Sequence, residues 1–230
     1  SLEAPFVATT IVSTTMLEKI AEGAGADFFQ TLTGFKWIWT KSLEREAGGG
    51  SFVFGFEEAL GYCVGPVVRD KDGIGAAQVL MELAAELKSQ GMTLLDQLER
   101  LYRQHGLYLN EQVAVRLPGL DGRARIDALM DGLRNAPPSE VAGFALEELL
   151  DLAGEDADTL GFARSNVLIM RLSQGSRVVV RPSGTEPKLK SYLEVREAVS
   201  EGESMDEARA RAQPRMDALK GWIQSVIEGG

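Results

Sequence analysis

Hydrophobic and polar positions in the first half of the chain alternate between two patterns. Short apolar, β-branched runs at 5–12, 26–29 and 51–54 predict buried strands. Between and after them, apolar residues recur at helical spacing, and glycines or capping residues mark the ends. The predicted helices cover residues 16–23, 35–46, 73–87 and 93–105. Strands that alternate with helices favour an α/β layer built on a parallel sheet.

The pattern changes near residue 110. A strand or linker is predicted at 110–117 and a helix at 121–133. Two β-rich runs, 166–172 and 177–180, are separated by Ser173-Gln174-Gly175-Ser176, which is typical of a hairpin. A third strand at 188–195 follows, and then a capping box, Ser204 to Glu207, opens a last helix that Pro214 would kink or split. The fold class is therefore α/β, with an α/β sheet domain at residues 1–112 and a smaller α+β domain with an antiparallel sheet at 113–230.

Composition excludes several classes of protein. The 230 residues are 44% hydrophobic and 25% charged, which is typical of a soluble globular protein. The apolar runs are too short for a transmembrane helix, and the start lacks a signal peptide, so we expect a cytoplasmic protein. A net charge of −10 argues against nucleic-acid binding. Single copies of cysteine and histidine exclude a disulfide framework and a Cys- or His-rich metal site, and argue against a His-based nucleophilic centre.

Positive charge is concentrated in residues 159–193, which hold six Lys or Arg side chains and one acid. Solvated strand faces are one explanation, and an anion site is the other. The second is favoured by the segment 181–188, Arg-Pro-Ser-Gly-Thr-Glu-Pro-Lys. Its glycine can take a positive φ and lets a ligand approach the backbone, while successive N–H groups, two hydroxyls, an arginine fork and a lysine can bind phosphate oxygens. The lysine that adds positive charge to the phosphate site is either Lys188 or Lys190. The candidate phosphate-binding residues are Arg181, Ser183, Gly184, Thr185 and Lys188.

Three loops in the first half carry polar or cationic groups after predicted strands, where α/β folds bind ligands. The segment 55–62 offers Glu57 as an acceptor for sugar hydroxyls, although an ordinary surface loop would look similar. Asp72 is a plausible N-cap that places Lys71 at the mouth of a helix. The segment 31–36 combines threonine hydroxyls, a glycine and a lysine. Together with the anion loop, these segments fit a sugar phosphate.

Four segments, in this order, resemble signature segments of the α-D-phosphohexomutase superfamily, the phosphoglucomutase and phosphomannomutase enzymes. They are residues 33–36, 55–62, 70–73 and 181–188. Enzymes of that family have four domains: the first carries a phosphoserine, the second holds Mg²⁺, the third recognises the sugar and the fourth binds phosphate. This chain resembles only the third and fourth, and it begins with Ser1, so we expect a C-terminal piece of a larger protein.

The resemblance implies a role for each matching position. Glu57 would bind sugar hydroxyls, and Lys71 would assist as a cation near the reacting phosphate or sugar. Ala59 stands where many members have serine, which leaves the substrate open between glucose, mannose and ribose phosphates. Thr33, Gly34 and Lys36 would line the cleft. The candidate phosphate-binding residues would clamp the phosphate that is not transferred.

The implied activity interconverts sugar 1-phosphate and sugar 6-phosphate through a bisphosphorylated intermediate. Mg²⁺ and sugar 1,6-bisphosphate are expected cofactors of the full-length enzyme, not of this part alone. Sugar phosphates and the N-terminal domains of the same polypeptide are the expected partners, with no nucleic acid and no membrane. No catalytic nucleophile and no metal loop lie in this chain, so we expect it to be inactive by itself.

Other functions remain open. The same loops would serve a stand-alone sugar-phosphate sensor or pseudoenzyme. The sugar loop also resembles that of phosphopentomutase-like and bisphosphate-synthesising branches. A structural domain whose basic strands face an acidic partner would have no phosphate affinity, and Arg181→Ala would not change ligand binding.

Overall fold

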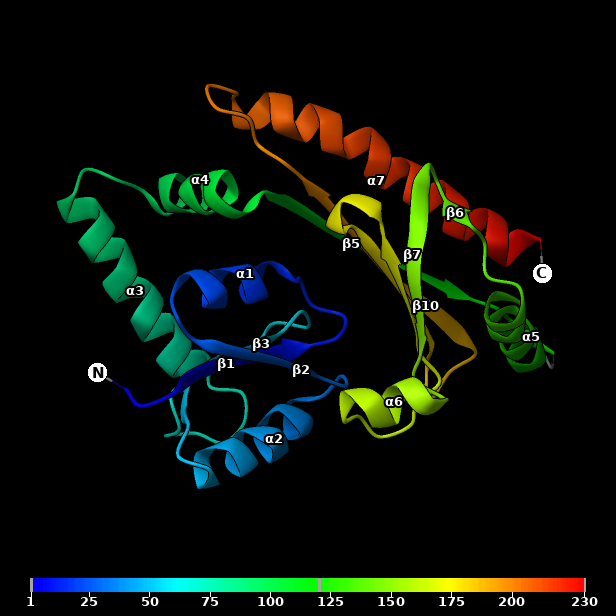
Figure 1. Ribbon diagram of the computed structural model, residues 1–230, viewed down its shortest axis with the longest axis horizontal. Helices are drawn as coiled ribbons and strands as arrows, with labels where there is room; N and C mark the ends of the chain where they lie inside the picture. The colour runs from blue at the N-terminus through cyan, green and yellow to red at the C-terminus, as the bar shows by residue number, and fades with distance from the viewer. Residues whose placement is uncertain (1, 120, 230) are drawn as a thin grey trace. The chain divides into compact units, whose positions relative to one another are not determined.

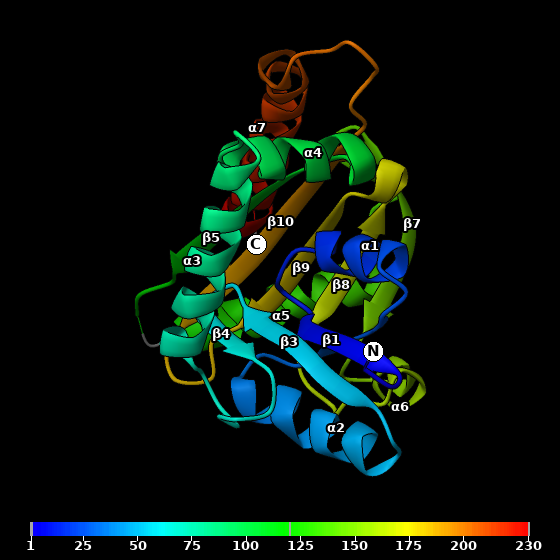
Figure 2. The ribbon, with the colours of Figure 1, turned by 90° about the vertical axis from the view of Figure 1, so that its left-hand side faces the viewer.

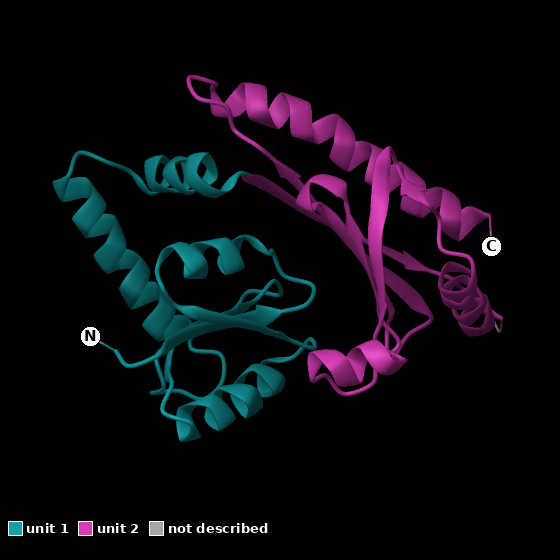
Figure 3. Ribbon diagram, in the orientation of Figure 1, with its two compact units in different colours: residues 1–106 teal, residues 107–230 magenta. Residues whose placement is uncertain are grey.

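The computed structural model describes residues 2–119 and 121–229. The chain forms two compact units, which divide between Gly106 and Leu107 (Figure 3). We call them unit 1 and unit 2. The boundary proposed near residue 112 from the sequence falls inside β5 (Leu107–Arg116), the strand with which unit 2 begins.

Unit 1 is built on a four-stranded sheet in the order β2-β1-β3-β4. β1 (Pro5–Thr10) pairs in parallel with both β2 (Asp27–Thr31) and β3 (Ser51–Glu57). β4 (Gly61–Val64) is antiparallel to β3, so the sheet is mixed rather than parallel throughout, and β4 was not predicted. Because β1, β2 and β3 share a direction, their carboxyl ends meet at one edge of the sheet.

Helices cover both faces of this sheet: α1 (Met16–Gly23) lies on one face and α2 (Phe35–Ala47) on the other (Figure 1). α3 (Gly73–Ser89) packs beside β4, and α4 (Leu94–His105) contacts α1 and α3 (Figure 2). The core between the sheet and α2 is rich in aromatic side chains, which bury large apolar areas. It comprises Phe6, Ala8, Phe29, Phe35, Ile38, Trp39, Phe52 and Cys63.

Unit 2 contains a six-stranded sheet in the order β5-β10-β9-β8-β7-β6, with every pairing antiparallel. The hairpin predicted at 173–176 joins β8 to β9, and the antiparallel sheet is confirmed. β6 and β7 were not predicted from the sequence. The strands after β5 are β6 (Glu140–Val141), β7 (Phe144–Asp151), β8 (Leu168–Leu172), β9 (Arg177–Pro182) and β10 (Lys188–Glu197).

Three helices complete unit 2: α5 (Gly122–Asn135), α6 (Glu155–Leu160) and α7 (Met205–Glu228). α7 packs along β10 and β5 (Figure 1). The sequence predicted that Pro214 would kink or split this helix, and the split is wrong, because α7 continues across the proline. The apolar stripe that α7 buries repeats at helical spacing on both sides of the proline, so packing outweighs a penalty of roughly 3 kcal/mol. The stripe is Met205, Ala208, Ala212, Met216, Leu219, Ile223 and Ile227.

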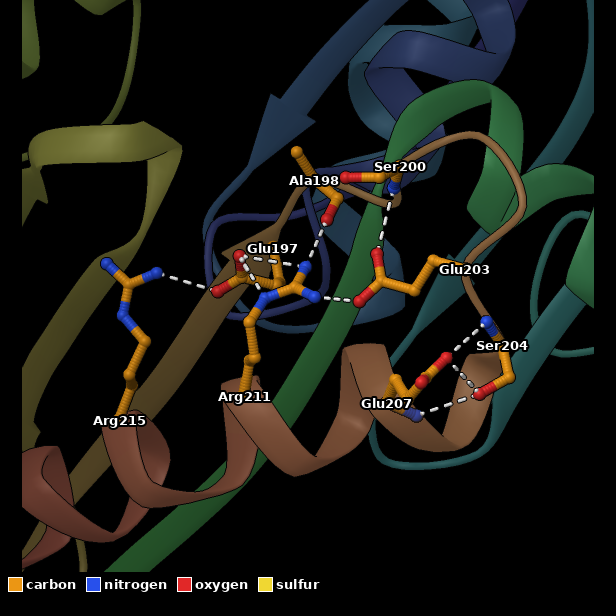
Figure 4. A network of polar contacts seen from close by, with 8 residues as sticks. All are labelled: Glu197, Ala198, Ser200, Glu203, Ser204, Glu207, Arg211 and Arg215. Carbon is orange, nitrogen blue, oxygen red and sulfur yellow. Dashed lines mark hydrogen bonds and ion pairs between the residues drawn. The ribbon is translucent and has the colours of Figure 1, made fainter.

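A network of ion pairs fastens the start of α7 to the end of β10 (Figure 4). Glu197 lies 2.7 Å from Arg215 and 3.4 Å from Arg211. Arg211 also forms an ion pair with Glu203 and donates to the carbonyl of Ala198 at 2.8 Å. Because Glu197 and Glu203 are only 14% and 10% exposed, these pairs are better shielded from water than ordinary surface pairs. No helix in the described ranges is long and apolar enough to cross a membrane.

Candidate functional site

In unit 1, the loops at the carboxyl edge of the sheet are tied to one another. Ser13 follows β1, and its hydroxyl accepts a hydrogen bond from the N–H of Glu58 at 3.0 Å. The same hydroxyl lies 2.9 Å from that of Thr10. Nothing in the local sequence pattern shows that Ser13 reaches the segment after β3.

The segment 55–62 was predicted as a loop, and the structure corrects this. Most of it forms a hairpin in which Glu57, the last residue of β3, pairs with Gly61, the first of β4. The tip is Glu58-Ala59-Leu60. Leu60 has φ of 60° and its side chain is 79% exposed, the left-handed position that usually carries glycine in three-residue hairpin loops. Ala59 is exposed at the tip.

Glu57 and Lys71 meet over Gly61. A Cβ added to Gly61 would lie 2.8 Å from Cγ of Glu57 and 3.1 Å from Cδ of Lys71. Two charged side chains from different segments therefore share the space above one glycine. Glu57 is half-buried, and the Lys71 side chain remains 53% exposed.

Lys71 also brings the start of α2 into this cluster. Its ammonium lies 5.4 Å from the centre of the Phe35 ring, and Phe35 is the first residue of α2. It lies 3.0 Å from Oδ1 of Asp70. Hydrogen bonds from the side chain and then the backbone of Lys71 lower the pKa of Asp70 below its ordinary value. The group formed by Glu57, Lys71 and Phe35 is called the Glu57–Lys71 cluster below.

The backbone next to Lys71 is fixed from both sides. The N–H of Asp72 donates to the carbonyl of Tyr62 at 2.6 Å, which ties the segment to β4. The Asp72 carboxylate accepts from the N–H of Gly75 at 2.9 Å, so the predicted N-cap is confirmed. A Cβ at Gly75 would lie only 2.3 Å from that carboxylate, which explains the glycine.

The remaining candidates of unit 1 lie at the start of α2. Gly34 is the N-cap of the helix, and its φ of 118° is one that other residues rarely adopt. Lys36 is exposed, and its ammonium lies 5.1 Å from the centre of the Trp37 ring. Thr33 is half-buried. Phe35, which lies between Thr33 and Lys36 in sequence, is the residue through which α2 contacts Lys71.

Cys63 and His105 are not part of the Glu57–Lys71 cluster. Cys63 is fully buried, its Sγ lies 3.0 Å from the carbonyl of Val68, and burial raises the pKa of its thiol to about 11. His105 ends α4, with Cε1 3.6 Å from the Cβ position of Gly23. The described residues include no group of three His, Cys, Asp or Glu placed to hold a metal ion.

In unit 2, the segment 181–188 forms the loop between β9 and β10. The N–H of Ser183 donates to the carbonyl of Lys188 at 2.7 Å, and the N–H of Lys188 donates to that of Glu186 at 2.8 Å. These bonds close the base of the loop. At the exposed apex, Gly184 and Thr185 form no hydrogen bond with any residue in 2–119 or 121–229. Their N–H groups and the Thr185 hydroxyl are therefore available to a ligand.

Gly184 does not use the conformation expected of it. Its φ lies outside the left-handed region, and a Cβ would meet nothing within 4 Å. The fold of the loop therefore does not require glycine here. The absence of a side chain leaves the apex bare, which suits close approach of a ligand to the backbone.

Cations face one another across the strands that carry this loop. Lys190 lies directly opposite Arg181, and Lys188 lies directly opposite Arg116. Directly opposite residues share a face of the sheet, and like charges in this arrangement repel. Lys188, Lys190 and Arg116 form no ion pair with any of the described residues. An anion bound at this end of the sheet would relieve the repulsion.

Family comparisons match both units. Residues 2–105 match "Phosphoglucomutase/phosphomannomutase, alpha/beta/alpha domain III", and residues 139–212 match "Phosphoglucomutase/phosphomannomutase, C-terminal domain". A probable phosphomannomutase of Haemophilus influenzae is 41% identical over 191 residues, which are 83% of this chain and 36% of that protein. A phosphoglucomutase of Staphylococcus aureus is 33% identical over 195 residues, or 81% of this chain and 35% of that protein. The chain thus spans about a third of the length of these relatives.

Solved structures share the fold at low sequence identity. The open form of pp63/parafusin, a phosphoglucomutase from Paramecium, has a TM-score of 0.66 at 19% identity, covering 93% of this chain and 37% of that one. A putative phosphomannomutase from Thermus thermophilus has a TM-score of 0.58 at 18% identity, covering 99% of this chain and 37% of that one.

Proposed function

The chain belongs to the phosphoglucomutase/phosphomannomutase family, and from this we propose that it is the part of a phosphohexomutase that binds the sugar hydroxyls and the phosphate that is not transferred. The whole protein would be an isomerase that interconverts sugar 1-phosphate and sugar 6-phosphate through a bisphosphorylated sugar. The phosphoserine would come from the N-terminal domains of the same polypeptide.

The 181–188 loop carries this proposal. Its apex presents N–H groups without partners among the described residues, and two pairs of cross-strand cations lie beside it. Phosphoryl transfer depends mainly on positioning and on neutralising charge. Arg181, Ser183, Gly184, Thr185 and Lys188 would fix one phosphate and thereby present the other end of the sugar for reaction.

The Glu57–Lys71 cluster would hold the sugar. A carboxylate accepts hydrogen bonds from hydroxyls, and the adjacent ammonium of Lys71 would approach the reacting phosphate. Thr33, Gly34 and Lys36, at the start of α2, would line the same sugar-binding site. Ala59 supplies no hydroxyl at the hairpin tip, so the choice between glucose, mannose and ribose phosphates depends on other contacts.

The family resemblance implies Mg²⁺ and a sugar 1,6-bisphosphate for the whole enzyme. The described residues do not fit a metal site, because they gather no set of three His, Cys, Asp or Glu side chains. We therefore assign Mg²⁺ to the rest of the polypeptide and give this chain no step that involves it.

A chimera tests the proposal. This chain would replace the matching segment of the Haemophilus influenzae relative, and mutase activity would be measured in a coupled assay. We expect the 230 residues alone to be inactive, the chimera to be active, and Arg181→Ala to lower its activity strongly. Arg171→Ala is the matched control, because Arg171 lies in the same sheet but pairs with Glu148. Robust turnover by the isolated chain, or equal effects of both substitutions, would contradict the proposal.

A further inference from the structure

Leu117, directly after β5, and Arg123, in α5, contact the two limbs of the 181–188 loop. The N–H of Leu117 donates to the carbonyl of Pro187 at 2.9 Å, on the returning limb. Nη1 of Arg123, in the first turn of α5, donates to the carbonyl of Ser183 at 3.3 Å, on the outgoing limb. The sequence analysis placed both residues in predicted elements and gave neither of them a role at the site.

Gly122, the first residue of α5, packs closely against Leu117. A Cβ at Gly122 would lie 2.0 Å from the carbonyl oxygen of Leu117 and 3.4 Å from Cβ of Pro187. A Cβ at this position would clash with the backbone of Leu117, so glycine is what lets α5 begin directly against that carbonyl. Arg123 is the next residue of α5, and its guanidinium reaches Ser183 while its Nε lies 3.7 Å from Oδ1 of Asp127.

The bond from Arg123 fixes one peptide plane at the apex. The carbonyl of Ser183 and the N–H of Gly184 belong to the same peptide unit, and no peptide bond in the described part of the chain is cis. In a trans peptide these two groups point in opposite directions. Glycine, with no Cβ, lets such a unit rotate easily. Holding the Ser183 carbonyl on the α5 side therefore directs the Gly184 N–H away from α5.

We propose that Arg123 is a positioning residue of the 181–188 loop, which keeps the Gly184 N–H turned toward the bound phosphate by holding the Ser183 carbonyl. The inference rests on the proposed function, because it takes the loop to be a phosphate site. A donor whose direction is fixed before the ligand arrives loses less entropy when it binds. Arg123 acts through the backbone of the loop and does not itself touch the phosphate.

The test uses the 230-residue chain, labelled with ¹⁵N and ¹³C, with Arg123→Gln and Arg123→Lys. Arg125→Gln is the matched control, because it removes the same charge from the same turn of α5, and the Arg125 side chain forms no hydrogen bond or ion pair with residues 181–188. One readout, without ligand, is the carbonyl shift of Ser183 and the amide shift of Gly184. The other is the affinity for inorganic phosphate at fixed pH and ionic strength.

We expect Arg123→Gln to move both resonances and to weaken phosphate binding about fivefold relative to Arg125→Gln. Arg123→Lys should restore part of the affinity, since an ammonium can also donate to the carbonyl. Equal affinities for the two Gln variants would overturn the proposal, as would unmoved Ser183 and Gly184 resonances. Absence of phosphate binding by the unaltered chain would contradict the proposed function, and the ligand-free resonances would then still decide whether Arg123 sets the apex.

Discussion

The side chains of Glu57 and Lys71 cover the same backbone position, Gly61. A Cβ there would lie 3.0 Å from Oε1 of Glu57 and 3.1 Å from Cδ of Lys71. A carboxylate at the end of β3 and a lysine just before α3 are thereby held side by side, although many residues separate them in the chain. The lack of a side chain at Gly61 is a condition for this arrangement.

Gly61→Ala should therefore weaken ligand binding by the Glu57–Lys71 cluster more than it lowers the stability of the fold. The new methyl group would clash with side chains, not with backbone, so we expect the melting temperature to fall by only a few degrees. Glu57 and Lys71 would have to move apart, and the affinity for glucose 1-phosphate should fall about fivefold. Gly73→Ala is the control, because a Cβ there meets nothing within 4 Å. Isothermal titration calorimetry measures these affinities. An affinity of Gly61→Ala equal to that of Gly73→Ala and of the unaltered chain would contradict this account.

The hairpin tip stores backbone strain at Leu60. A left-handed conformation costs a residue with a Cβ roughly 1–2 kcal/mol, whereas glycine adopts it freely but loses more entropy on folding. Because Leu60 is 79% exposed, little packing is lost with its side chain. Leu60→Gly should raise the unfolding free energy by about 0.5 kcal/mol, measured by urea denaturation. Ala59→Gly is the control: Ala59 has no positive φ, so this substitution should not raise the unfolding free energy. A lower unfolding free energy for Leu60→Gly would contradict the hairpin geometry.

The thiol of Cys63 should make stability fall at alkaline pH. Burial raises its pKa from 9.0 to about 11, so the folded state keeps the thiol protonated while the unfolded state ionises first. This contribution is complete below pH 9 and is lost as the pH rises toward 11. We expect the difference in unfolding free energy between the unaltered chain and Cys63→Ala to shrink across that window. A constant difference would show that the thiol titrates alike in both states.

The capping box of α7 should contribute measurably to the stability of unit 2. The Ser204 hydroxyl accepts from the N–H of Glu207 at 3.2 Å, and the Glu207 carboxylate accepts from the N–H of Ser204 at 2.9 Å. Ser204→Ala should lower the unfolding free energy by about 1 kcal/mol, and Ser200→Ala, in the loop before it, should have little effect.

This contribution should also depend on pH. The hydrogen bond from the Ser204 backbone, and then that from its side chain, lower the pKa of Glu207 below its ordinary value of 4.5. The stabilisation is present above pH 4.5 and is lost as the pH falls through the lower, folded-state pKa. The gap between Ser204→Ala and the unaltered chain should therefore narrow in acid, by the part that comes from the hydrogen bond of the Ser204 hydroxyl to the carboxylate. A gap that stays constant to pH 3 would mean that the carboxylate does not take part.

Where apolar periodicity ran without interruption, the sequence predicted the fold well. The strands beginning at Pro5 and Ser51 and the helices after Gly34 and Asp72 are examples. The hairpin of β3 and β4 was missed because Gly55 and Gly61 interrupt the alternation. β7 was missed because its register shifts between Leu146 and Glu148, which breaks the two-residue period of a strand.

The candidate site shows the same limit. Glu57, Lys71 and the 181–188 loop could be found from local chemistry and from the family resemblance. Ser13 and Arg123 could not, because each acts on a segment 45 or 60 residues away through a backbone group. A hydroxyl or guanidinium that supports another loop leaves no local pattern in the sequence.

Amide chemical-shift titration of this chain with glucose 1-phosphate, with inorganic sulfate as the control anion, tests the central claim most directly. We expect both ligands to shift the amides of 181–188, and only the sugar phosphate to shift those of 55–71 as well. Shifts confined to 181–188 and identical for both ligands would reduce the site to a general anion loop, and an absence of shifts in both segments would contradict the account.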